Sequence, residues 1–516
     1  MSILVVEKLS HSFGGRQIFE DVSFRLQKGE HVGLVGANGE GKSTFMNILT
    51  RHLEPETGKI TWAKNVKVGY LDQHTVLVEG ETIEDTLKKA YQELFTIEQE
   101  INDLYMNMGD MTDIQMSEAL EDAGLKQEYL EAHDFYMIDT KIKEVADAFG
   151  LSDYGLATKV EELSGGQRSK VLLAKLLLEK PDILLLDEPT NYLDSEHIDW
   201  LTTYLSTYDN AFILVSHDIP FLNKVVNIIY HVEAPTITRY VGNYDEFRRV
   251  YEIQKKQLEA KYERQQAEIE KMEDFIARNK ARVATRGMAN SRKKRLDKIE
   301  RIELKKEKPK PEFNFKYGRT SSRWVIEAND LVIGYDTALS KPITIALEKG
   351  KKIAITGTNG LGKSTLIKSL IGIIEPISGS VHQGDNLEIG YFKQEEKAPR
   401  KSCIDDLWDT FPSYTQLEIR SALAKCGLTT EQLESIVSVL SGGEQAKLRL
   451  CKIINTPTNF LVLDEPTNHL DVDAKDELKR ALTEYKGTMI LVCHEREFYD
   501  GLVDEVWDMS QYSLLK

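Results

Sequence analysis

Uninterrupted apolar runs recur at two places in the chain, and each is closed by a pair of carboxylates. The runs are Ile183–Glu188 and Phe460–Glu465. Apolar stretches of this length without polar alternation are typical of strands buried on both faces of a parallel sheet. A third apolar run, His31–Val35, leads into a glycine-rich stretch and then into a helical pattern at Thr44–Leu49. The pattern predicts an α/β fold built from strand–loop–helix units.

A helical period marks a segment that only the first half of the chain contains. From Ile83 to Leu104, apolar residues recur at steps of three and four. Between equivalent motifs, described below, the first half is about 44 residues longer than the second, and the excess falls roughly within 85–140. We expect a helical arm of two antiparallel helices here. A helical insertion with no role of its own is the alternative.

The middle of the chain shows a second helical pattern, with heptad spacing and one polar interruption. Its seam consists of Leu258, Tyr262, Gln265, Ile269, Met272 and Ile276. A shorter stripe follows at Leu296, Ile299 and Ile302. Between them, Ala284–Asn290 contains glycine and asparagine, which favour turns. The pattern predicts a helical hairpin about 45 Å long, which ends at the proline-containing stretch Lys308–Pro311.

Charge is strongly segregated along the chain. The 516 residues carry a formal net charge of −17, which by itself disfavours a nucleic-acid partner. From Glu252 to Lys310, however, there are 19 basic and 11 acidic residues, a net of +8, so the rest of the chain carries −25. Arg278–Arg295 contains eight basic residues and no acidic one. The tip of the predicted hairpin therefore suits a phosphate-bearing surface; a merely solvated helix face is the alternative.

Composition places the chain among soluble, cytoplasmic proteins of two to four domains. No apolar run approaches the ~20 residues needed to span a bilayer, and the N-terminus lacks the features of a secretory signal. All four cysteines lie in the second half without metal-ligand spacing. We expect them to be buried and reduced.

The glycine-rich stretches match the phosphate-binding pattern G-x-x-x-x-G-K-[ST] twice. The matches are Gly36–Ser43 and Gly357–Ser364. The glycines let main-chain N–H groups surround nucleotide phosphates, and the following helix N-terminus adds partial positive charge. We expect the lysine of each loop to bridge the phosphates of ATP and its serine to bind Mg²⁺.

The acidic pairs at the ends of the apolar runs suit the same chemistry. Asp187 and Asp464 lie where Mg²⁺ coordination is expected, and Glu188 and Glu465 can polarise the attacking water. Because each pair follows a P-loop in the same order, the sequence predicts ATP hydrolysis at two sites.

Signature-like stretches ahead of the acidic pairs complete a resemblance to the ATP-binding-cassette superfamily. They read Leu163–Gln167 in the first copy and Leu440–Glu444 in the second. The resemblance extends to D-loops at Asn191–Asp194 and Asn468–Asp471. It also implies that Gln73 and Gln394 reach Mg²⁺ and the water, that His217 and His494 contact the γ-phosphate, and that Phe13 and Tyr335 stack on adenine.

The resemblance implies two cassettes that close head to tail within one monomeric chain, with each ATP between one P-loop and the opposite signature. The implied catalytic residues are Glu188, His217, Glu465 and His494. The implied Mg²⁺ ligands are Ser43, Gln73, Asp187, Ser364, Gln394 and Asp464. The implied ATP-binding residues are Phe13, Gly36, Ala37, Asn38, Gly39, Glu40, Gly41, Lys42, Ser43, Thr44, Gln73, Ser164, Gly165, Gly166, Gln167, Tyr335, Gly357, Thr358, Asn359, Gly360, Leu361, Gly362, Lys363, Ser364, Thr365, Gln394, Ser441, Gly442, Gly443 and Glu444.

Tandem cassettes with an arm in the first and a basic helical linker between them resemble, more narrowly, the ABC-F family. Its members bind ribosomes rather than membranes or DNA. The resemblance implies a translation ATPase whose linker lies against peptidyl-site tRNA and rRNA near the peptidyl-transferase centre, and whose arm reaches the large subunit near the exit-site stalk. The implied RNA-binding residues are Arg278, Lys280, Arg282, Arg286, Arg292, Lys293, Lys294 and Arg295.

Two other functions remain open from the sequence. One is antibiotic resistance through ribosome protection, for which longer linker tips are more common. The other is the ATPase subunit of a membrane transporter, for which a basic linker has no use. The expected organisation is a first cassette at 1–250 with its arm at 85–140, a linker at 251–320 and a second cassette at 321–516.

Overall fold

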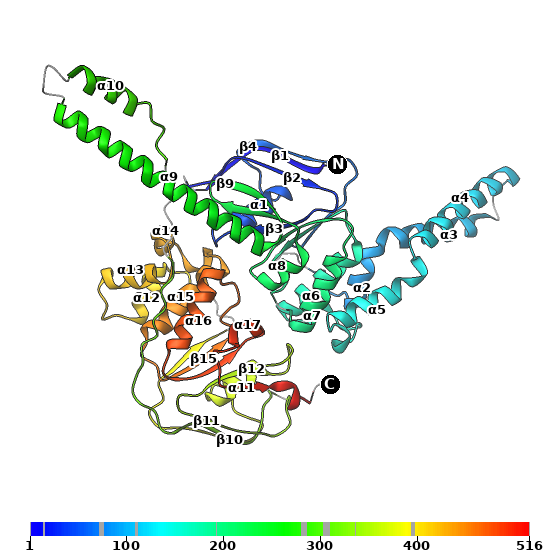
Figure 1. The fold of residues 1–516 in the computed structure, drawn as a ribbon. Coiled ribbons are helices and arrows are strands. Elements are labelled where there is room, and N and C mark those ends of the chain that lie inside the picture. Colours follow the sequence, from blue (N-terminus) through cyan, green and yellow to red (C-terminus); the bar gives the residue numbers. More distant parts are fainter. Residues whose placement is uncertain are drawn as a thin grey trace.

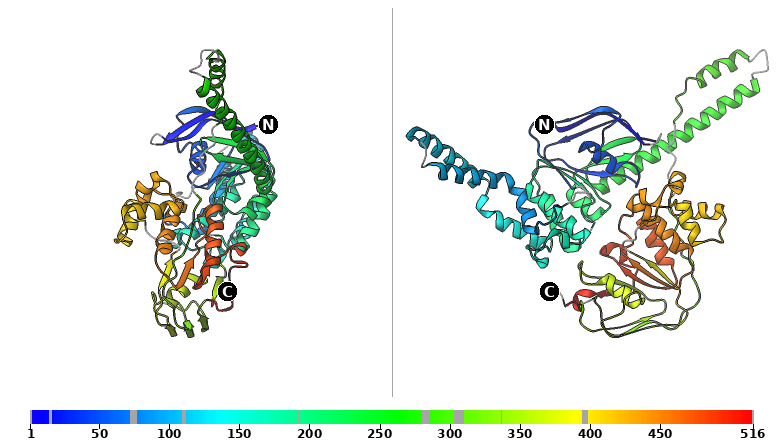
Figure 2. Two further views of the ribbon diagram at one scale, coloured as in Figure 1. Left: turned by 60° about the vertical axis from the view of Figure 1, so that its left-hand side comes forward. Right: turned by 180° about the vertical axis from the view of Figure 1, so that it is seen from behind.

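The computed structural model describes two α/β units from which a helical arm and a helical hairpin project in different directions (Figures 1 and 2). It confirms the predicted fold class. The described residues are 2–13, 16–71, 77–108, 112–191, 193–279, 286–302, 310–335, 337–393 and 398–514, with only the main chain described at 16 and 286.

The first unit is built on a six-stranded sheet in the order β5-β6-β7-β3-β8-β9, parallel except for antiparallel β9. Its strands are β3 (His31–Val35), β5 (Val68–Leu71), β6 (Ile183–Asp187), β7 (Ala211–Val215), β8 (Ile228–Glu233) and β9 (Thr236–Val241). A smaller antiparallel sheet, in the order β2-β1-β4, contains β1 (Ser2–Phe13), β2 (Arg16–Gln27) and β4 (Thr57–Trp62).

The apolar run at β6 is buried because both faces of the sheet are covered. Ile183 and Leu185 pack in a core with the small sheet and with α1 (Lys42–Leu49). Leu184 and Leu186 pack in a second core on the opposite face. That face is covered by α6 (Gly165–Glu179), α7 (Ser195–Ser206) and α8 (Ile219–Val225).

The second unit repeats this plan with an all-parallel sheet in the order β14-β15-β16-β12-β17. Its strands are β12 (Lys352–Thr356), β14 (Ile389–Phe392), β15 (Phe460–Asp464), β16 (Thr488–Val492) and β17 (Glu505–Asp508). The small sheet contains β10 (Trp324–Val332), β11 (Ile343–Glu348) and β13 (Ser378–Gln383). The helices are α11 (Lys363–Leu370), α12 (Cys403–Thr410), α13 (Gln416–Lys425), α14 (Thr430–Glu434), α15 (Gly442–Asn455), α16 (Val472–Glu484) and α17 (Arg496–Tyr499).

The arm consists mainly of α3 (Gln92–Asn107) and α4 (Asp113–Ala132), which lie side by side and antiparallel (Figure 1). It is joined to the first unit by α2 (Ile83–Lys88) and α5 (Ile138–Ala148). Buried residues Leu94, Ile101, Ala123 and Leu130 belong to the same core as the helical face of the first sheet.

The hairpin consists of α9 (Tyr244–Asn279) and the shorter α10 (Arg286–Leu296). At 36 residues, α9 is about 54 Å long. Because α10 faces only the far part of α9, Ile269 and Met272 are buried while Leu258, nearer the base, is 44% exposed. Gln265, the polar interruption, uses its amide to hold the returning chain: Nε2 donates to the Glu300 carbonyl and Oε1 accepts from the Ile302 N–H, both at 2.8 Å.

Two local expectations for the hairpin were wrong. The expected turn at Ala284–Asn290 is helical from Arg286 onward, with 284 and 285 outside the described residues. Arginine, methionine and alanine favour a helix enough to outweigh one glycine. The stripe at Ile299 and Ile302 is not helical, because α10 ends at Leu296.

Two expectations drawn from composition can be compared with the structure. Each of the four cysteines is buried and none forms a disulfide. Within the described part of the chain, no helix is both long and apolar enough to cross a membrane.

Candidate functional site: two nucleotide sites at the facing surfaces of the cassettes

The first P-loop connects the end of β3 to the start of α1. Gly41, directly before α1, has φ 100°, and a Cβ at this position would collide with Ile18. Only glycine meets both requirements, so this residue fixes the turn into the helix. Lys42 Nζ donates to the carbonyls of Gly36 (2.8 Å) and Ala37 (3.2 Å), which holds the ammonium inside the loop. The lysine is thus placed where the phosphates of a P-loop nucleotide bind.

The second P-loop has the same geometry. Lys363 Nζ donates to the carbonyls of Gly357 (2.7 Å) and Thr358 (2.8 Å), and Gly362 precedes α11 with φ 85°. Burial lowers the pKa of Lys363 to about 8, opposed by Glu465 and by Asp194 of the first cassette. Burial likewise lowers the pKa of Lys42, and here Glu188 and Asp187 are the main opposing groups.

In each acidic pair the aspartate is the last residue of the strand, and the glutamate after it has a backbone conformation in the left-handed region. Glu188 has φ 49° and Glu465 φ 50°, and their N–H groups donate to Val215 and Val492 on the neighbouring strands. Because the strands are parallel, the carboxylates and P-loop lie at the same edge of each sheet. In both sites, the same arrangement of strands and loops therefore brings the P-loop lysine and the carboxylates to one edge of the sheet.

The two glutamates differ in their electrostatic surroundings. Burial, reinforced by Asp187, raises the pKa of Glu188 to about 8, and its Oε1 makes no hydrogen bond within the described residues. Burial also acts on Glu465, but the hydrogen bond and charge of His494 (Nε2–Oε1 3.2 Å), the charge of Lys363 and a hydrogen bond from Asn468 (Nδ2–Oε2 2.7 Å) together outweigh it and hold the pKa below its usual value. Both oxygens of Glu465 thus accept hydrogen bonds, whereas Glu188 accepts only at Oε2 among the described residues, from the His217 N–H at 3.4 Å.

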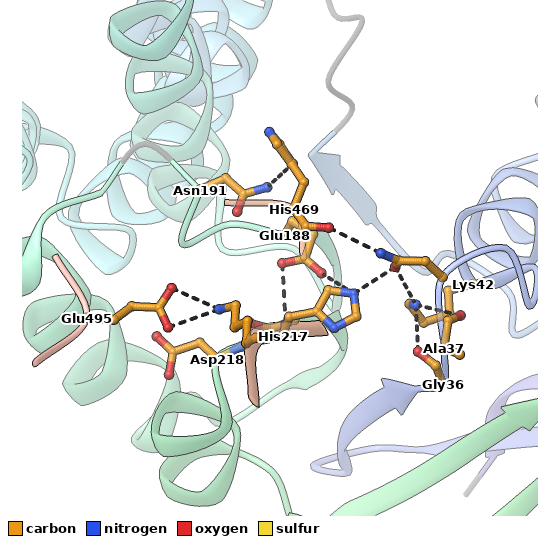
Figure 3. A network of polar contacts seen from close by, with 12 residues as sticks. Gly36, Ala37, Lys42, Glu188, Asn191, His217, Asp218, His469 and Glu495 are labelled. Atoms are coloured by element: carbon orange, nitrogen blue, oxygen red, sulfur yellow. Dashed lines mark hydrogen bonds and ion pairs between the residues drawn. The ribbon is translucent and has the colours of Figure 1, made fainter. Parts of the chain in front are cut away.

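His217 connects the first glutamate to the P-loop (Figure 3). Its Nε2 lies 3.1 Å from Asn38 Oδ1 and 3.5 Å from Glu188 Oε1. Burial, followed by the charge of Lys42, lowers the pKa of His217 to about 3, so the ring is neutral. The predicted switch histidine therefore lies between the predicted hydrolytic carboxylate and the P-loop.

The first P-loop also touches the second cassette. Asn38 Nδ2 donates to the carbonyl of His469, in the second D-loop, at 3.1 Å, and Asn191 of the first D-loop lies 3.4 Å from the His469 ring (Nδ2–Nδ1). A Cβ at Gly443, in the second signature, would collide with Asn38 Nδ2. The P-loop of one cassette thus faces the signature and D-loop of the other, as head-to-tail closure requires.

Both signature serines cap the helices that carry them. Ser164 directly precedes α6 and Ser441 directly precedes α15, each in a capping box with the residue three positions later. Gln167 Oε1 accepts from Ser164 N–H at 2.8 Å, and Glu444 Oε2 accepts from Ser441 N–H at 2.9 Å. Each helix N-terminus, with its partial positive charge, is therefore fixed in a form that suits an anion.

Asp464 and Ser364 fit a Mg²⁺ ion that arrives with the nucleotide. Burial raises the pKa of Asp464 to about 6, opposed by a hydrogen bond with Ser364. Its Oδ1 is buried and makes no hydrogen bond within the described residues. Those residues contain no group of three or more His, Cys, Asp or Glu side chains that could hold a metal. This agrees with the coordination that Mg²⁺ prefers, in which the protein supplies few ligands and phosphate oxygens and water supply the others.

The predicted adenine-stacking and Q-loop residues are less well defined. Phe13 and Tyr335 are 49% and 62% exposed, so each offers a free ring face. Gln73 and Gln394 lie outside the described residues.

Two lysines at the cassette interface were missed by the sequence analysis. Lys447 Nζ donates to Asp471 Oδ2 at 2.7 Å, which ties the second signature helix to the second D-loop. Lys475, on α16, lies in a cavity shared by both cassettes. No motif marks either position, and only the pairing of distant segments shows their roles.

The predicted RNA-binding residues fall into three groups. Three arginines have partners on α9: Arg278 pairs with Asp274, Arg295 with Glu268, and Arg292 lies over the Phe275 ring. Lys293 and Lys294 are exposed and form no ion pair within the described residues. Lys280 and Arg282, and the side chain of Arg286, lie outside them.

Comparisons with known proteins agree with this geometry. A family model described as "ABC transporter" matches residues 19–191 and 340–468, and an extension model with the same description matches 230–315. The chain is 61% identical over 514 residues to the Bacillus subtilis (strain 168) protein "Uncharacterized ABC transporter ATP-binding protein YfmM", covering 99% of each chain. It is 36% identical over 526 residues to "ABC transporter F family member 2" of Arabidopsis thaliana, covering 99% of this chain and 77% of that protein.

Solved structures with two cassettes have the same fold. "RNase-L Inhibitor" superimposes with a TM-score of 0.57 at 19% identity, covering 97% of this chain and 87% of that one. "Model of ribosome-bound archaeal Pelota and ABCE1" gives a TM-score of 0.58 at 20% identity, covering 97% and 76%.

Proposed function

Because the chain belongs to the ABC-F family of tandem ATP-binding-cassette ATPases, we propose that it is a cytoplasmic translation factor that hydrolyses ATP on the ribosome. The observation that carries the proposal is the basic hairpin tip. It projects away from two cassettes whose remaining sequence is strongly acidic (Figure 1). Such a tip suits RNA phosphates, while the body would be repelled by them.

ATP would be bound at both facing surfaces. In the first site, Lys42 holds the phosphates, Ser441 and Gly443 of the opposite signature contact the γ-phosphate, and Glu188 polarises the attacking water. In the second site, Lys363, Ser164 and Glu465 act in the same way. Mg²⁺, held by Ser43 and Asp187 or by Ser364 and Asp464, would neutralise phosphate charge. ATP binding joins the cassettes and hydrolysis separates them.

Closure would fix the direction of the hairpin. The base of α9 is anchored in the first cassette, where the Phe247 ring packs against Tyr240 and His231, each with ring centroids 5.0 Å apart. A rigid helix of about 54 Å carries any rotation of its base to the tip. We propose that the tip then lies against peptidyl-site tRNA and rRNA near the peptidyl-transferase centre.

Lys293 and Lys294 are the phosphate partners that the structure favours. Arg278 and Arg295 are already paired with carboxylates, and breaking those ion pairs would offset part of any new interaction. The archaeal ABCE1 structure of the same fold is described as ribosome-bound, so a tandem-cassette protein of this shape is compatible with that partner. The connection between α9 and α10 is short in the sequence, which favours a general translation role over drug displacement.

Ribosome co-sedimentation tests the proposal. The variant Glu188→Gln/Glu465→Gln should remain closed with ATP, and we expect it to pellet with ribosomes in ATP but not in ADP. Adding Lys293→Gln/Lys294→Gln should weaken pelleting and reduce the salt slope by about 0.7–0.9 for each lysine that no longer neutralises a phosphate. Lys256→Gln/Lys261→Gln, on the shaft of α9, is the charge-matched control. A trapped protein that stays in the supernatant at every salt concentration overturns the proposal.

A further inference from the structure

Lys475 of the second cassette lies in a cavity that the catalytic groups of both cassettes line. The cavity lining includes Glu188, His217 and Asp218 from the first cassette and Glu465, His494 and Glu495 from the second. Lys475 Nζ donates to both carboxylate oxygens of Glu495, at 2.8 and 3.0 Å. Only 16% of the lysine side chain is exposed. Figure 3 shows Glu495 making these two contacts beside Asp218 and His217.

The charges around Lys475 come from both cassettes. Asp218 and Glu495 directly follow the two switch histidines, so they occupy equivalent positions in the two copies. Although burial lowers the pKa of Lys475, the charges of Glu495, Glu188 and Asp218 outweigh it, and the pKa is raised above its usual value. The ammonium is therefore held charged, and Glu188 of the opposite cassette is one of the groups that hold it.

The first cassette has no matching lysine. Counting four residues from the aspartate of each D-loop, Lys475 follows Asp471 and Ile198 follows Asp194. Ile198 lines the same cavity and carries no charge. In addition, Glu465 already receives hydrogen bonds from His494 and Asn468, whereas Glu188 Oε1 receives none within the described residues. Glu188 Oε2 accepts from the His217 N–H at 3.4 Å, so Glu188 has weaker hydrogen-bond support than Glu465, and it is the charge of Glu188 that acts on Lys475.

We propose that Lys475 is a positioning residue supplied in trans, which orients Glu188 electrostatically and makes hydrolysis at the first site depend on contact with the second cassette. Glu495 fixes the lysine side chain, so the ammonium stays in the cavity that Glu188 also lines instead of turning toward solvent. The second site hydrolyses without such a residue, and the two sites are unequal. The inference rests on the proposed role of Glu188 in polarising water.

Single-turnover ATP hydrolysis by the purified full-length chain, without ribosomes, tests the inference site by site. In a Glu465→Gln background, which silences the second site, Lys475→Ile should lower the hydrolysis rate about tenfold with ATP affinity unchanged, since it removes an interaction used mainly in the transition state. Lys475→Arg should keep the rate within about threefold of the parent, because it restores the charge. In a Glu188→Gln background, Lys475→Ile should leave the remaining rate within about twofold.

Lys479→Ile is the matched control. It removes a lysine one turn along α16 that, among the described residues, donates to the main-chain carbonyls of Glu497 and Asp500. Equal loss at both sites, or weaker ATP binding with an unchanged rate, would show a structural role and overturn the inference. An unchanged hydrolysis rate for Lys475→Ile in the Glu465→Gln background would also overturn the inference. The same holds if the Glu465→Gln parent hydrolyses no ATP. Because no ribosome is present, failure of ribosome binding would leave this result unaffected.

Discussion

The side-chain amide of Asn38 donates to the main-chain carbonyl of His469 at 3.1 Å, which connects the P-loop of one cassette to the D-loop of the other. The oxygen of the same amide lies 3.1 Å from His217 Nε2. A single side chain therefore contacts both the switch histidine of its own site and the opposite cassette. Asn38 is therefore placed to couple closure of the two cassettes to the catalytic groups of the first site.

Asn38→Ala should slow hydrolysis at the first site more than Asn359→Ala slows it at the second. Removing the Asn38 amide eliminates its hydrogen bonds with the His469 carbonyl and His217 Nε2, together with the longer one from Lys42 at 3.5 Å. The first two contribute about 1 kcal/mol each, and we expect a rate roughly tenfold lower in a Glu465→Gln background. Asn359 in the matching loop accepts from Lys363 at 3.4 Å and serves as the comparison. Single-turnover rates measure both, and equal losses at the two sites would contradict the expectation.

The P-loop lysines should set the nucleotide stoichiometry. Each ammonium is held inside its loop by main-chain carbonyls, so its charge is available only to that site. We expect Lys42→Met and Lys363→Met each to bind one ATP per chain, and the double variant to bind none. Isothermal titration calorimetry counts the sites. Two ATP molecules bound by either single variant would argue against the assignment.

Neutralising the two glutamates should change stability in opposite directions. The pKa of Glu188 is raised to about 8 by burial and Asp187, so the folded state keeps a proton that the unfolded chain releases near pH 4.5. Its carboxylate therefore destabilises the fold increasingly as pH rises from about 4.5 to about 8, by at most ~1.4 kcal/mol per pH unit. Glu188→Gln should raise the melting temperature of the nucleotide-free protein at pH 8.5, with a smaller gain at pH 5.5.

Glu465→Gln is the matched variant, for which we expect a change in melting temperature of the opposite sign. The pKa of Glu465 is lowered because His494, the charge of Lys363 and the hydrogen bond from Asn468 together outweigh burial, so its ionised form stabilises the fold above about pH 4.5. Glutamine at this position should lower the melting temperature at pH 8.5. Differential scanning calorimetry of the two variants measures both melting temperatures. Shifts of the same sign at pH 8.5 would refute the electrostatic difference between the two glutamates.

Gln265→Leu should loosen the hairpin even though it makes the seam more apolar. The substitution leaves the Ile302 N–H and the Glu300 carbonyl without their partner, at about 0.5–1.5 kcal/mol per bond. We expect hydrogen exchange at Ile302 to accelerate roughly tenfold. Gln257→Leu, exposed on the same helix, is the control. Unchanged exchange at Ile302 would show that Gln265 does not hold the returning chain.

Local sequence patterns were enough to predict the parts of the fold that depend on local physics. The apolar run at Ile183–Leu186 predicted a strand covered on both faces, and alternate residues of β6 do pack in two different cores. The same reasoning applies to β15 at Phe460–Leu463. In both cases a long apolar run without polar alternation has only one stable environment.

Hydrogen bonds across the cassette interface could not be predicted in this way. Asn38 and His469 are more than 400 positions apart, and their hydrogen bond involves a main-chain carbonyl that carries no sequence signal. Lys475 lies outside every motif, and on a helix a lysine is most often simply solvated. In the hairpin, the polar residue at Gln265 was recognised as an interruption, but its main-chain partners depend on how the chain returns after α10.

The most direct test of the proposed ribosomal function is a chemical footprint of ribosomes bound to the ATP-trapped variant Glu188→Gln/Glu465→Gln. We expect protection of peptidyl-site tRNA and of rRNA near the peptidyl-transferase centre. That protection should disappear when Lys293 and Lys294 are changed to glutamine and remain in the Lys256→Gln/Lys261→Gln control. Ribosome binding that leaves those nucleotides unprotected, or protection that survives removal of both tip lysines, would contradict the account.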